Sequence, residues 1–222
     1  LKKLIRIDKD CHGTIVIAWV ILACLIACVL YFSHSLWVQI PLITIFLLNA
    51  VFVFWFHRVP ERTAPEGDDR TVTSVADGKV IIVEKVYEKE YFKEERIQVS
   101  VYMNFFDVHA NFWPMDGQIS YYKYHPGKYL LAFLPKASEK NEHATTVIGN
   151  SHGEVLFKQI AGTFARRIVC YSETGNSVKR AEQCGIIKFG SRIDMYFPLD
   201  ADIKVKVGDL TRACETVIAE LR

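Results

Sequence analysis

The sequence predicts a mainly β domain preceded by a pair of membrane-spanning helices. Residues 14–32 and 37–56 are almost wholly apolar and contain no Asp, Glu, Lys or Arg, which predicts the helices. The rest of the chain alternates short runs rich in Val and Ile with Gly, Asp and Asn, which predicts strands joined by turns. The 222 residues are therefore expected to divide into a membrane hairpin at 1–57, a linker at 58–69 and a domain at 70–222.

The two apolar runs predict a hairpin whose ends lie on one side of the membrane. Each run is long enough to cross the ~30 Å of hydrocarbon, and only residues 33–36 separate them. A secretory signal peptide would not be followed by a second span. The basic residues near the spans lie before the first and after the second: Lys2, Lys3, Arg6, Lys9, Arg58 and Arg62. The positive-inside rule then places both ends, and the following domain, in the cytoplasm.

The domain at 70–222 is expected to be built of short strands, with few helices. Four runs rich in β-branched residues predict strands at 79–84, 97–102, 155–160 and 203–207. Helices are expected at 162–171 and, as a short turn, after Asp107.

Two Asp-Gly pairs, Asp77-Gly78 and Asp116-Gly117, each precede a β-branched residue and predict tight turns. Residues 205–209 and 216–221 resemble the hammerhead strands of lipoyl- or biotinyl-domain barrels. The expected fold is thus a barrel-sandwich hybrid of lipoyl-like sheets with a few short helices.

Composition excludes several classes of function. With 27 basic and 25 acidic residues the formal charge is +2, too small an excess for binding a phosphate backbone, so no nucleic-acid partner is expected. None of the six cysteines forms a Cys-x-x-Cys pair and two lie in the first span, so we expect neither a metal site nor disulfides, but small buried side chains.

The bond between Gly190 and Ser191 is the feature with the richest chemistry. Glycine has no Cβ to block attack by the serine hydroxyl on the preceding carbonyl carbon. Such an attack gives an ester, and elimination followed by hydrolysis leaves a pyruvoyl ketone with release of ammonia. That ketone forms a Schiff base with an amine and withdraws electrons as CO₂ leaves. Taken alone, the dipeptide is far more typical of an ordinary serine in a strand or turn.

Several separated motifs decide between these interpretations. They occur in this order: Arg58–Arg62, Val75–Val80, Phe106–Asn111, Pro126–Tyr129, Asn141–Glu142, Gln159–Val169 and Phe189–Asp194. Together with the hairpin they resemble the short, type II phosphatidylserine decarboxylase proenzymes. The resemblance implies self-cleavage into a β chain (1–190) and an α chain (191–222) that stay together. It also implies a pyruvoyl cofactor derived from Ser191 and conversion of phosphatidylserine to phosphatidylethanolamine and CO₂ at the inner membrane.

The resemblance also implies roles for individual residues. Ser191 would be the nucleophile of self-cleavage, Asp77 part of an Asp-His-Ser arrangement, and His109 an aid to decarboxylation. Long relatives carry a second histidine three residues after the first, and Phe112 occupies that position here. The base for self-cleavage is therefore open between His109, His125 and His143, and the proton donor is open as well.

Two further questions stay open at the level of sequence. Arg166 and Arg167 would bind a lipid phosphate or the substrate carboxylate, or else form a solvated or headgroup-facing surface. The functional alternatives are a membrane-anchored carrier or scaffold domain that never cleaves, in which Lys79 follows the Asp77-Gly78 turn, and a pyruvoyl decarboxylase of another amino-acid substrate. A monomer and a homo-oligomer fit the sequence equally well.

Overall fold

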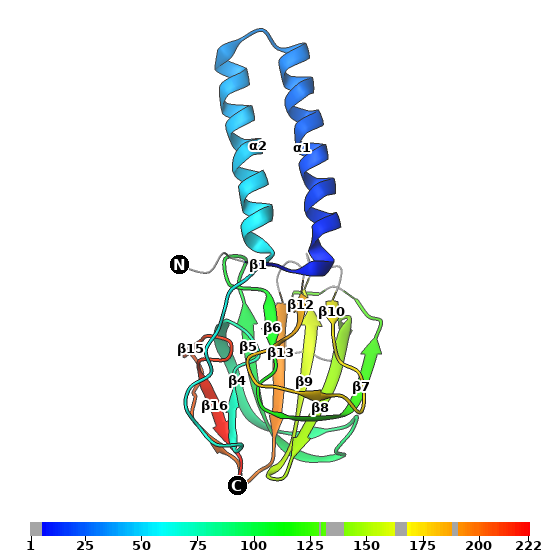
Figure 1. The fold of residues 1–222 in the computed structure, drawn as a ribbon, viewed down its shortest axis with the longest axis vertical. Helices are drawn as coiled ribbons and strands as arrows, with labels where there is room; N and C mark the ends of the chain where they lie inside the picture. Colours follow the sequence, from blue (N-terminus) through cyan, green and yellow to red (C-terminus); the bar gives the residue numbers. More distant parts are fainter. Residues whose placement is uncertain (1–5, 129, 132–139, 163–167, 188–190) are drawn as a thin grey trace. The chain divides into compact units, whose positions relative to one another are not determined.

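The computed structural model describes residues 6–128, 130–131, 140–162, 168–187 and 191–222 (Figure 1). Contacts divide the chain into two units, Leu1–Pro60 and Glu61–Arg222. The first unit holds the long helices and the second is built of strands, so the predicted class, mainly β with an N-terminal helical pair, is confirmed. The two units are described separately below.

The N-terminal unit is a helical hairpin with a short strand pair at its base. In chain order it contains β1 (Arg6–Ile7), the 3-10 helix η1 (Lys9–Cys11), α1 (His12–Phe32), α2 (Leu36–Phe56) and β2 (Arg58–Val59), and β1 pairs antiparallel with β2. Both long helices are long and apolar enough to cross a membrane. The Trp19 indole donates a hydrogen bond to the carbonyl of Ala50 and its ring stacks on Phe54, which ties the two helices together.

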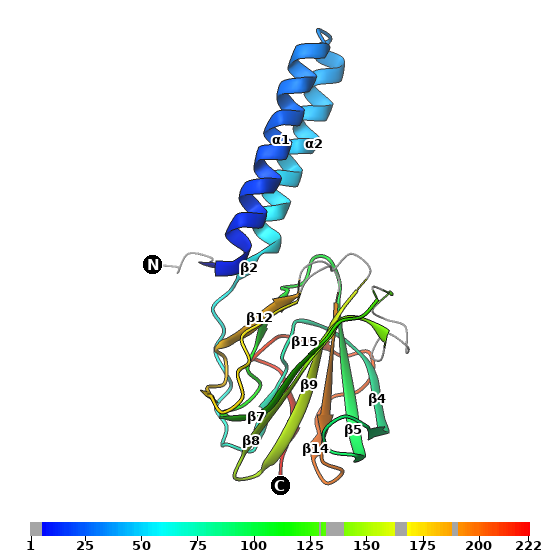
Figure 2. The same cartoon turned by 90° about the vertical axis from the view of Figure 1, so that its right-hand side faces the viewer.

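The second unit is dominated by an eight-stranded antiparallel sheet that is curled rather than flat (Figures 1 and 2). Its strands, in spatial order, are β11 (Ser177–Val178), β7 (Gly117–His125), β8 (His143–Asn150), β9 (Gly153–Ala161), β13 (Ser191–Phe197), β5 (Glu94–Met103), β4 (Gly78–Glu88) and β15 (Leu210–Thr211). The predicted strands 79–84, 97–102 and 155–160 lie inside β4, β5 and β9. Strand β13 occupies the middle of this sheet, between β9 and β5.

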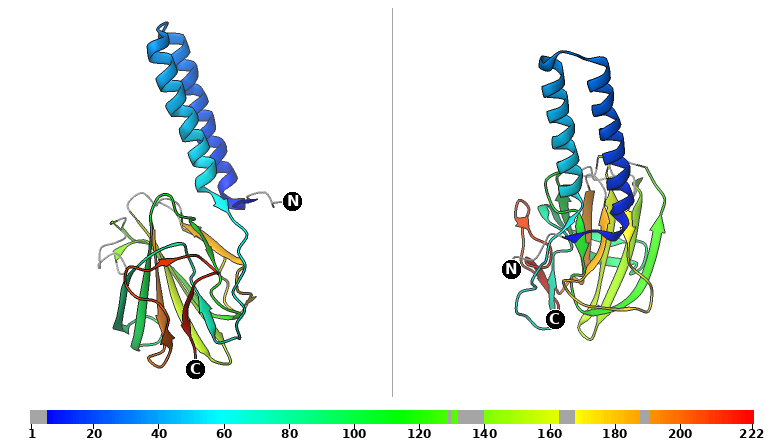
Figure 3. Two further views of the ribbon diagram at one scale, coloured as in Figure 1. Left: turned by 90° about the vertical axis from the view of Figure 1, so that its left-hand side faces the viewer. Right: turned by 45° about the horizontal axis from the view of Figure 1, so that its top comes forward.

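Two three-stranded sheets complete the unit. One has the order β10 (Ile168–Cys170), β12 (Gln183–Ile187) and β6 (Ala110–Phe112), and the other has the order β14 (Asp202–Ile203), β16 (Val217–Glu220) and β3 (Thr71–Thr73). The second sheet joins the start of the unit to the C-terminal segment, which is red in Figure 3. It therefore links segments on either side of the predicted cleavage point.

The hydrophobic core uses one face of each central strand. On β13 the buried side chains of Ile193, Met195 and Phe197 belong to the main core cluster. The alternate residues Arg192, Asp194 and Tyr196 leave on the opposite face, because side chains alternate along a strand. The two faces of the large sheet therefore have different chemistry.

Two corners of the fold repeat the same pattern of hydrogen bonds. In the Asp77 corner (Ser74–Gly78 with Ala213–Cys214), the Asp77 carboxylate accepts from the Ala213 N–H at 2.8 Å, and the Cys214 N–H donates to the Ser74 carbonyl at 2.9 Å.

In the Asp116 corner (Trp113–Gly117 with Arg180–Ala181), the carboxylate of Asp116 accepts from the Arg180 N–H at 2.6 Å, and the Ala181 N–H donates to the Trp113 carbonyl at 3.1 Å. Cys214 and Ala181 both have left-handed φ values, 65° and 70°. The two predicted Asp-Gly turns are thus equivalent parts of a repeated arrangement.

Three predictions about secondary structure are wrong in whole or in part. Instead of a helix ending at Tyr171, residues 168–170 form β10, because Val169 and its neighbours pair with Ile186 on β12; residues 163–167 lie outside the described residues. Asp107 closes a turn with Asn104 and leads into β6, not a helix. Of the predicted strand 203–207 only Ile203 belongs to β14, since Asp209 holds a turn by accepting from the Lys206 N–H.

The prediction that the cysteines are small buried side chains holds for part of the set. Cys11, Cys184 and Cys214 are buried, whereas Cys24 and Cys28 are exposed on α1. The difference follows from α1 itself, which is apolar on all sides and packs against α2 along one side only.

Candidate active site at the start of strand β13

Ser191 is the first residue of β13 and is fully buried. It pairs with Met103 on β5 and with Ala161 on β9. A central strand is hydrogen-bonded on both sides, so the backbone that follows the Gly190–Ser191 bond is held in a defined place. Gly190 itself lies outside the described residues.

The Ser191 hydroxyl belongs to a small group of side chains that we call the serine cluster: Ser191, Met103, Asn111 and Gln159. The Ser191 Oγ lies 3.6 Å from the Met103 Sδ, and the Asn111 Nδ2 lies 3.9 Å from the same sulfur. Gln159 Nε2 donates to Asn111 Oδ1 at 2.8 Å. A thioether is a weak acceptor, so the contact with Met103 leaves the hydroxyl of Ser191 available for chemistry.

One atom of the serine cluster is a buried acceptor without a partner among the residues that the structure describes. Gln159 is fully buried, and within that part of the chain its Oε1 has no hydrogen bond. Such an atom is costly unless a donor reaches it, and it marks the place where a substrate or reaction intermediate would supply one. Gly185 leaves room for the Gln159 amide group, because a Cβ there would fall on the Val169 carbonyl and come within 2.9 Å of Gln159 Nε2.

His109 is buried immediately before β6. Its carbonyl accepts from the Ile187 N–H at 3.2 Å, which extends the pairing of β6 with β12 to within three residues of Gly190. Its ring Nδ1 lies 3.1 Å from the Asp107 carbonyl, so Nδ1 carries the proton and Nε2 is the basic nitrogen. Since His109 and Asn111 are two residues apart on extended backbone, their side chains leave on the same side, where Asn111 meets the serine cluster.

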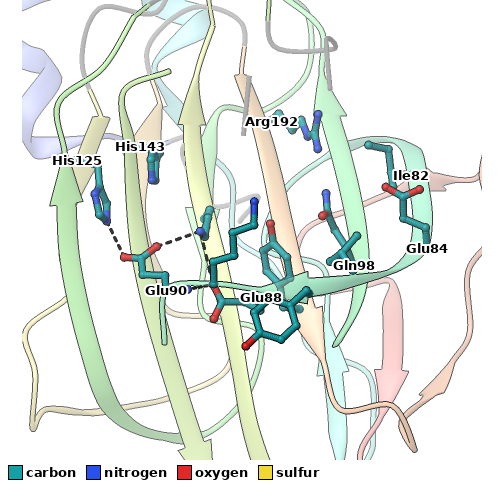
Figure 4. A pocket seen from close by; sticks show the side chains of 13 residues that line it. Ile82, Glu84, Glu88, Glu90, Gln98, His125, His143 and Arg192 are labelled. Atoms are coloured by element: carbon teal, nitrogen blue, oxygen red, sulfur yellow. Dashed lines mark hydrogen bonds and ion pairs between the residues drawn. The ribbon is translucent and has the colours of Figure 1, made fainter. Parts of the chain in front are cut away.

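Phe112 and the two other candidate histidines lie elsewhere. Phe112 is next to Asn111 on β6, so its side chain leaves on the opposite side of the strand, and it is buried. His125 and His143 line a pocket together with Arg192, on the face of the large sheet opposite to the Ser191 side chain (Figure 4). Of the three histidines that sequence left open as the base, His109 is the one that lies two residues from Asn111, a member of the serine cluster.

Asp77 pairs with Arg62 and with backbone. Its Oδ2 accepts from Arg62 Nη2 at 2.6 Å, and its Oδ1 accepts from the Ala213 N–H. Arg62 is almost completely buried and also reaches Glu215 at 3.2 Å. Burial raises the pKa of the neighbouring Cys214 thiol to about 12, with Arg62 lowering it and Asp77 and Glu215 raising it further. In the described residues, then, the carboxylate of Asp77 is joined to an arginine rather than hydrogen-bonded to His109 or Ser191.

Sequence reasoning missed a buried ion pair next to Ser191 in the chain, on the other face of the sheet. The fully buried Arg192 guanidinium contacts both oxygens of Asp194, at 2.5 and 3.1 Å, and Ser100 Oγ at 3.1 Å. Opposite charges two residues apart in an otherwise apolar strand were the available signal. Asn111 and Gln159 each end or begin one of the motifs quoted above, but no role was predicted for either. Arg166 and Arg167 lie outside the described residues.

Comparisons with known proteins identify the family. Residues 48–219 match the family model described as phosphatidylserine decarboxylase. Similar proteins include the "Phosphatidylserine decarboxylase proenzyme" of Amoebophilus asiaticus, 47% identical over 78% of this chain and 77% of the relative. The proteins of the same name from Bacteroides thetaiotaomicron and Porphyromonas gingivalis are 41% and 36% identical; they match 100% and 97% of this chain and 99% of their own lengths. The resemblance seen in the motifs is confirmed, and the chain belongs to the phosphatidylserine decarboxylase family, a family of decarboxylases.

Proposed function

We propose that the chain cleaves itself between Gly190 and Ser191 and then decarboxylates phosphatidylserine to phosphatidylethanolamine and CO₂. The observation that carries the proposal is the position of Ser191, at the start of a central strand, with a weakly held hydroxyl on the side of the sheet to which His109 and Asn111 project. Membership of the family supports the same conclusion.

In the first step the Ser191 hydroxyl attacks the carbonyl carbon of Gly190. His109 is suited to take the hydroxyl proton through Nε2 and to return it to the departing amine, so the peptide C–N bond breaks while an ester C–O bond forms. Loss of the Ser191 α-proton then expels the Gly190 carboxylate and leaves dehydroalanine. Its hydrolysis consumes one water, releases ammonia and leaves a pyruvoyl group at position 191.

The surroundings of residue 191 fit such a group. They are buried, and they combine the thioether of Met103 with the amides of Asn111 and Gln159. The Gln159 amide oxygen has no partner among the described residues, and none of the side chains of the serine cluster is charged. The pyruvoyl ketone supplies an electron-withdrawing carbonyl that links to the substrate amine and accepts electrons as CO₂ leaves. Gln159 Oε1 is placed to accept a hydrogen bond from a donor beside residue 191, and His109 to deliver the proton that replaces the carboxylate.

The two product chains would stay together through the sheets. After cleavage, β13 remains paired with both β5 and β9, β15 with β4, and β16 with β3. Core residues of the α chain such as Met195 and Ile218 belong to the same cluster as residues of the β chain. Dissociation would expose this core, so we expect a stable complex of both chains.

The hairpin fits an enzyme whose substrate stays in the bilayer. Two helices long enough to span are consistent with membrane anchoring. The basic residues that flank them favour the cytoplasmic side for the second unit. Phosphatidylserine would then be processed where its headgroup meets the cytoplasm.

Intact mass under denaturing conditions tests the cleavage. We expect an α chain of about 3.6 kDa that is about 17 Da lighter than the serine-started peptide 191–222, because a ketone has replaced the amino group. Ser191→Ala should remain a single 25.4 kDa chain. Ser177→Ala, on exposed β11, should process normally. An uncleaved wild-type chain would contradict the proposal and favour the carrier or scaffold alternative.

Release of CO₂ from carboxyl-labelled phosphatidylserine tests the substrate. The cleaved wild-type protein and Ser177→Ala should turn it over, and Ser191→Ala should not. Cleavage without turnover of this lipid would point to a pyruvoyl decarboxylase of another amine.

A further inference from the structure

A pocket of about 740 Å³ lies on the face of the large sheet opposite to the Ser191 side chain. Figure 4 shows Glu90, His125 and His143 together at one side of it, away from Arg192. One ligand atom from each of these three residues lies within 4.8 Å of the other two. The proposed reaction uses none of them.

The fold brings the three residues together from separate segments. His125 is the last residue of β7 and His143 the first of β8, and the two are paired directly across the strands. Their rings stack with centroids 4.4 Å apart and planes 14° apart. Glu90 comes from the turn between β4 and β5, where its Oε1 lies 2.6 Å from His125 Nε2.

The chemical state of each group suits a metal ligand. His143 Nδ1 lies 2.8 Å from the Asn141 carbonyl, so Nδ1 carries the proton and Nε2 keeps its lone pair. Metal-binding histidines usually donate a hydrogen bond in this way from the ring nitrogen that does not bind the metal, which fixes the orientation of the ring. Burial lowers the pKa of His143. Burial of Glu90 opposes ionisation, but the charge of Lys158 and hydrogen bonds from Lys158, His125 and Thr145 lower its pKa to about 2.

We propose that Glu90, His125 and His143 bind a divalent transition-metal cation, for which Zn²⁺ is the probe. Two imidazole nitrogens and one carboxylate oxygen form the donor set of open zinc sites, with water in the remaining position. The pocket gives an ion access, because side chains of His125 and Glu90 are 24% and 14% exposed.

Lys158 is a positive charge in direct contact with Glu90 and opposes a cation here. Its Nζ lies 3.0 Å from Glu90 Oε2, on the oxygen that His125 does not contact. It also lies 3.8 Å from Glu88 Oε1, so a second carboxylate can hold the ammonium when a metal takes Glu90. Metal binding at His125 Nε2 would replace its 2.6 Å contact with Glu90 Oε1.

The test is a Zn²⁺ titration of the full-length chain, purified in detergent with a histidine-free tag and stripped with chelator. We expect one site per chain, weakened more than about 100-fold in both Glu90→Gln and His143→Ala. His152→Ala, a histidine at the β8–β9 turn outside the cluster, should bind as the wild type does. Lys158→Met should bind about tenfold more tightly, because it removes a repelling charge.

Co²⁺ in place of Zn²⁺ gives a second readout. We expect a d–d spectrum without the thiolate charge-transfer band that binding to one of the free cysteines would produce. Three results would each overturn the proposal: a Zn²⁺ affinity in Glu90→Gln equal to that of the wild type, a wild-type affinity no higher than that of His143→Ala, or a thiolate band in the Co²⁺ spectrum. If His143→Ala fails to fold, the single variants His125→Ala and Glu90→Gln provide the same test, and both should bind Zn²⁺ more weakly than the wild type.

Discussion

The Asp77 and Asp116 corners share one backbone design and differ in the partners of their carboxylates. In both, an aspartate accepts from the N–H that precedes a left-handed residue. Among the residues that the structure describes, Asp77 has a charged side chain on its other oxygen, the buried Arg62, and Asp116 does not; Arg180 at the Asp116 corner reaches the carbonyls of Thr71 and Gly67 instead. The hydrogen bond that both aspartates accept is therefore structural. Any role of Asp77 in self-cleavage must depend on features of its own corner, such as the ion pair with Arg62.

The glycines after the two aspartates provide the largest expected effect. A Cβ at Gly78 would fall on the Tyr102 carbonyl, and its φ of 154° is a strained conformation for other residues. Gly117→Ala also meets a carbonyl, that of Gly149, but without the unfavourable φ. We expect Gly78→Ala to lower the free energy of unfolding by about 3–5 kcal/mol and Gly117→Ala by about 1–3 kcal/mol. Thermal melts in detergent would measure both, and equal losses would show that the two corners tolerate a Cβ alike.

Asp77→Asn and Asp116→Asn separate function from structure. An amide oxygen can still accept the repeated hydrogen bond, so we expect similar, small losses of stability at both corners. If Asp77 assists self-cleavage, Asp77→Asn should slow it by about 100-fold, equivalent to about 2.7 kcal/mol in the barrier. Asp116→Asn should change it by no more than a few-fold. The appearance of the α chain over time after synthesis gives the rates of self-cleavage. Equal rates in Asp77→Asn and Asp116→Asn would show that Asp77 has only a structural role in its corner.

The arginines of the two corners should differ in the same direction. Arg62→Met leaves the carboxylate of Asp77 without its cation, and we expect a loss of about 1–3 kcal/mol in the free energy of unfolding. Arg180→Met removes only long contacts to carbonyls, both at 3.4 Å, and should cost less than about 1 kcal/mol. Denaturant titration of both variants measures the difference. A larger loss of unfolding free energy in Arg180→Met than in Arg62→Met would contradict the conclusion that the Arg62–Asp77 ion pair distinguishes the two corners.

The left-handed residues provide the smallest effect. Ala181→Gly should stabilise the protein by about 0.5–1 kcal/mol, because glycine adopts this φ without strain. Cys214→Gly gains the same relief but loses a buried side chain, so we expect no net gain. A stabilised Cys214→Gly with an unchanged Ala181→Gly would reverse this reasoning.

Part of the candidate site was proposed from local sequence, and the rest depends on contacts between distant segments. Ser191 and His109 were proposed from motifs, and the structure places Ser191 at the start of a central strand and His109 immediately before β6; their roles stay predictions. Asn111 and Gln159, which are 48 positions apart, form their hydrogen bond only because β6 lies against β9. Arg62 was assigned only to membrane orientation, yet its side chain pairs with Asp77.

The sequence by itself determined the two apolar helices and the strands within β4, β5 and β9, because composition and alternation of side chains act over a few residues. It also pointed to Gly190–Ser191 as the cleavage point, through local motifs. Tertiary structure alone decided that residues 168–170 pair with β12 instead of forming a helix, and that Arg192 is neutralised by Asp194 across the sheet from the serine hydroxyl. It also decided that His125 and His143, open as bases in the sequence, meet Glu90 on the other face. The physical reason is that strand register places residues far apart in the chain side by side, and register depends on the whole sheet rather than on any local run.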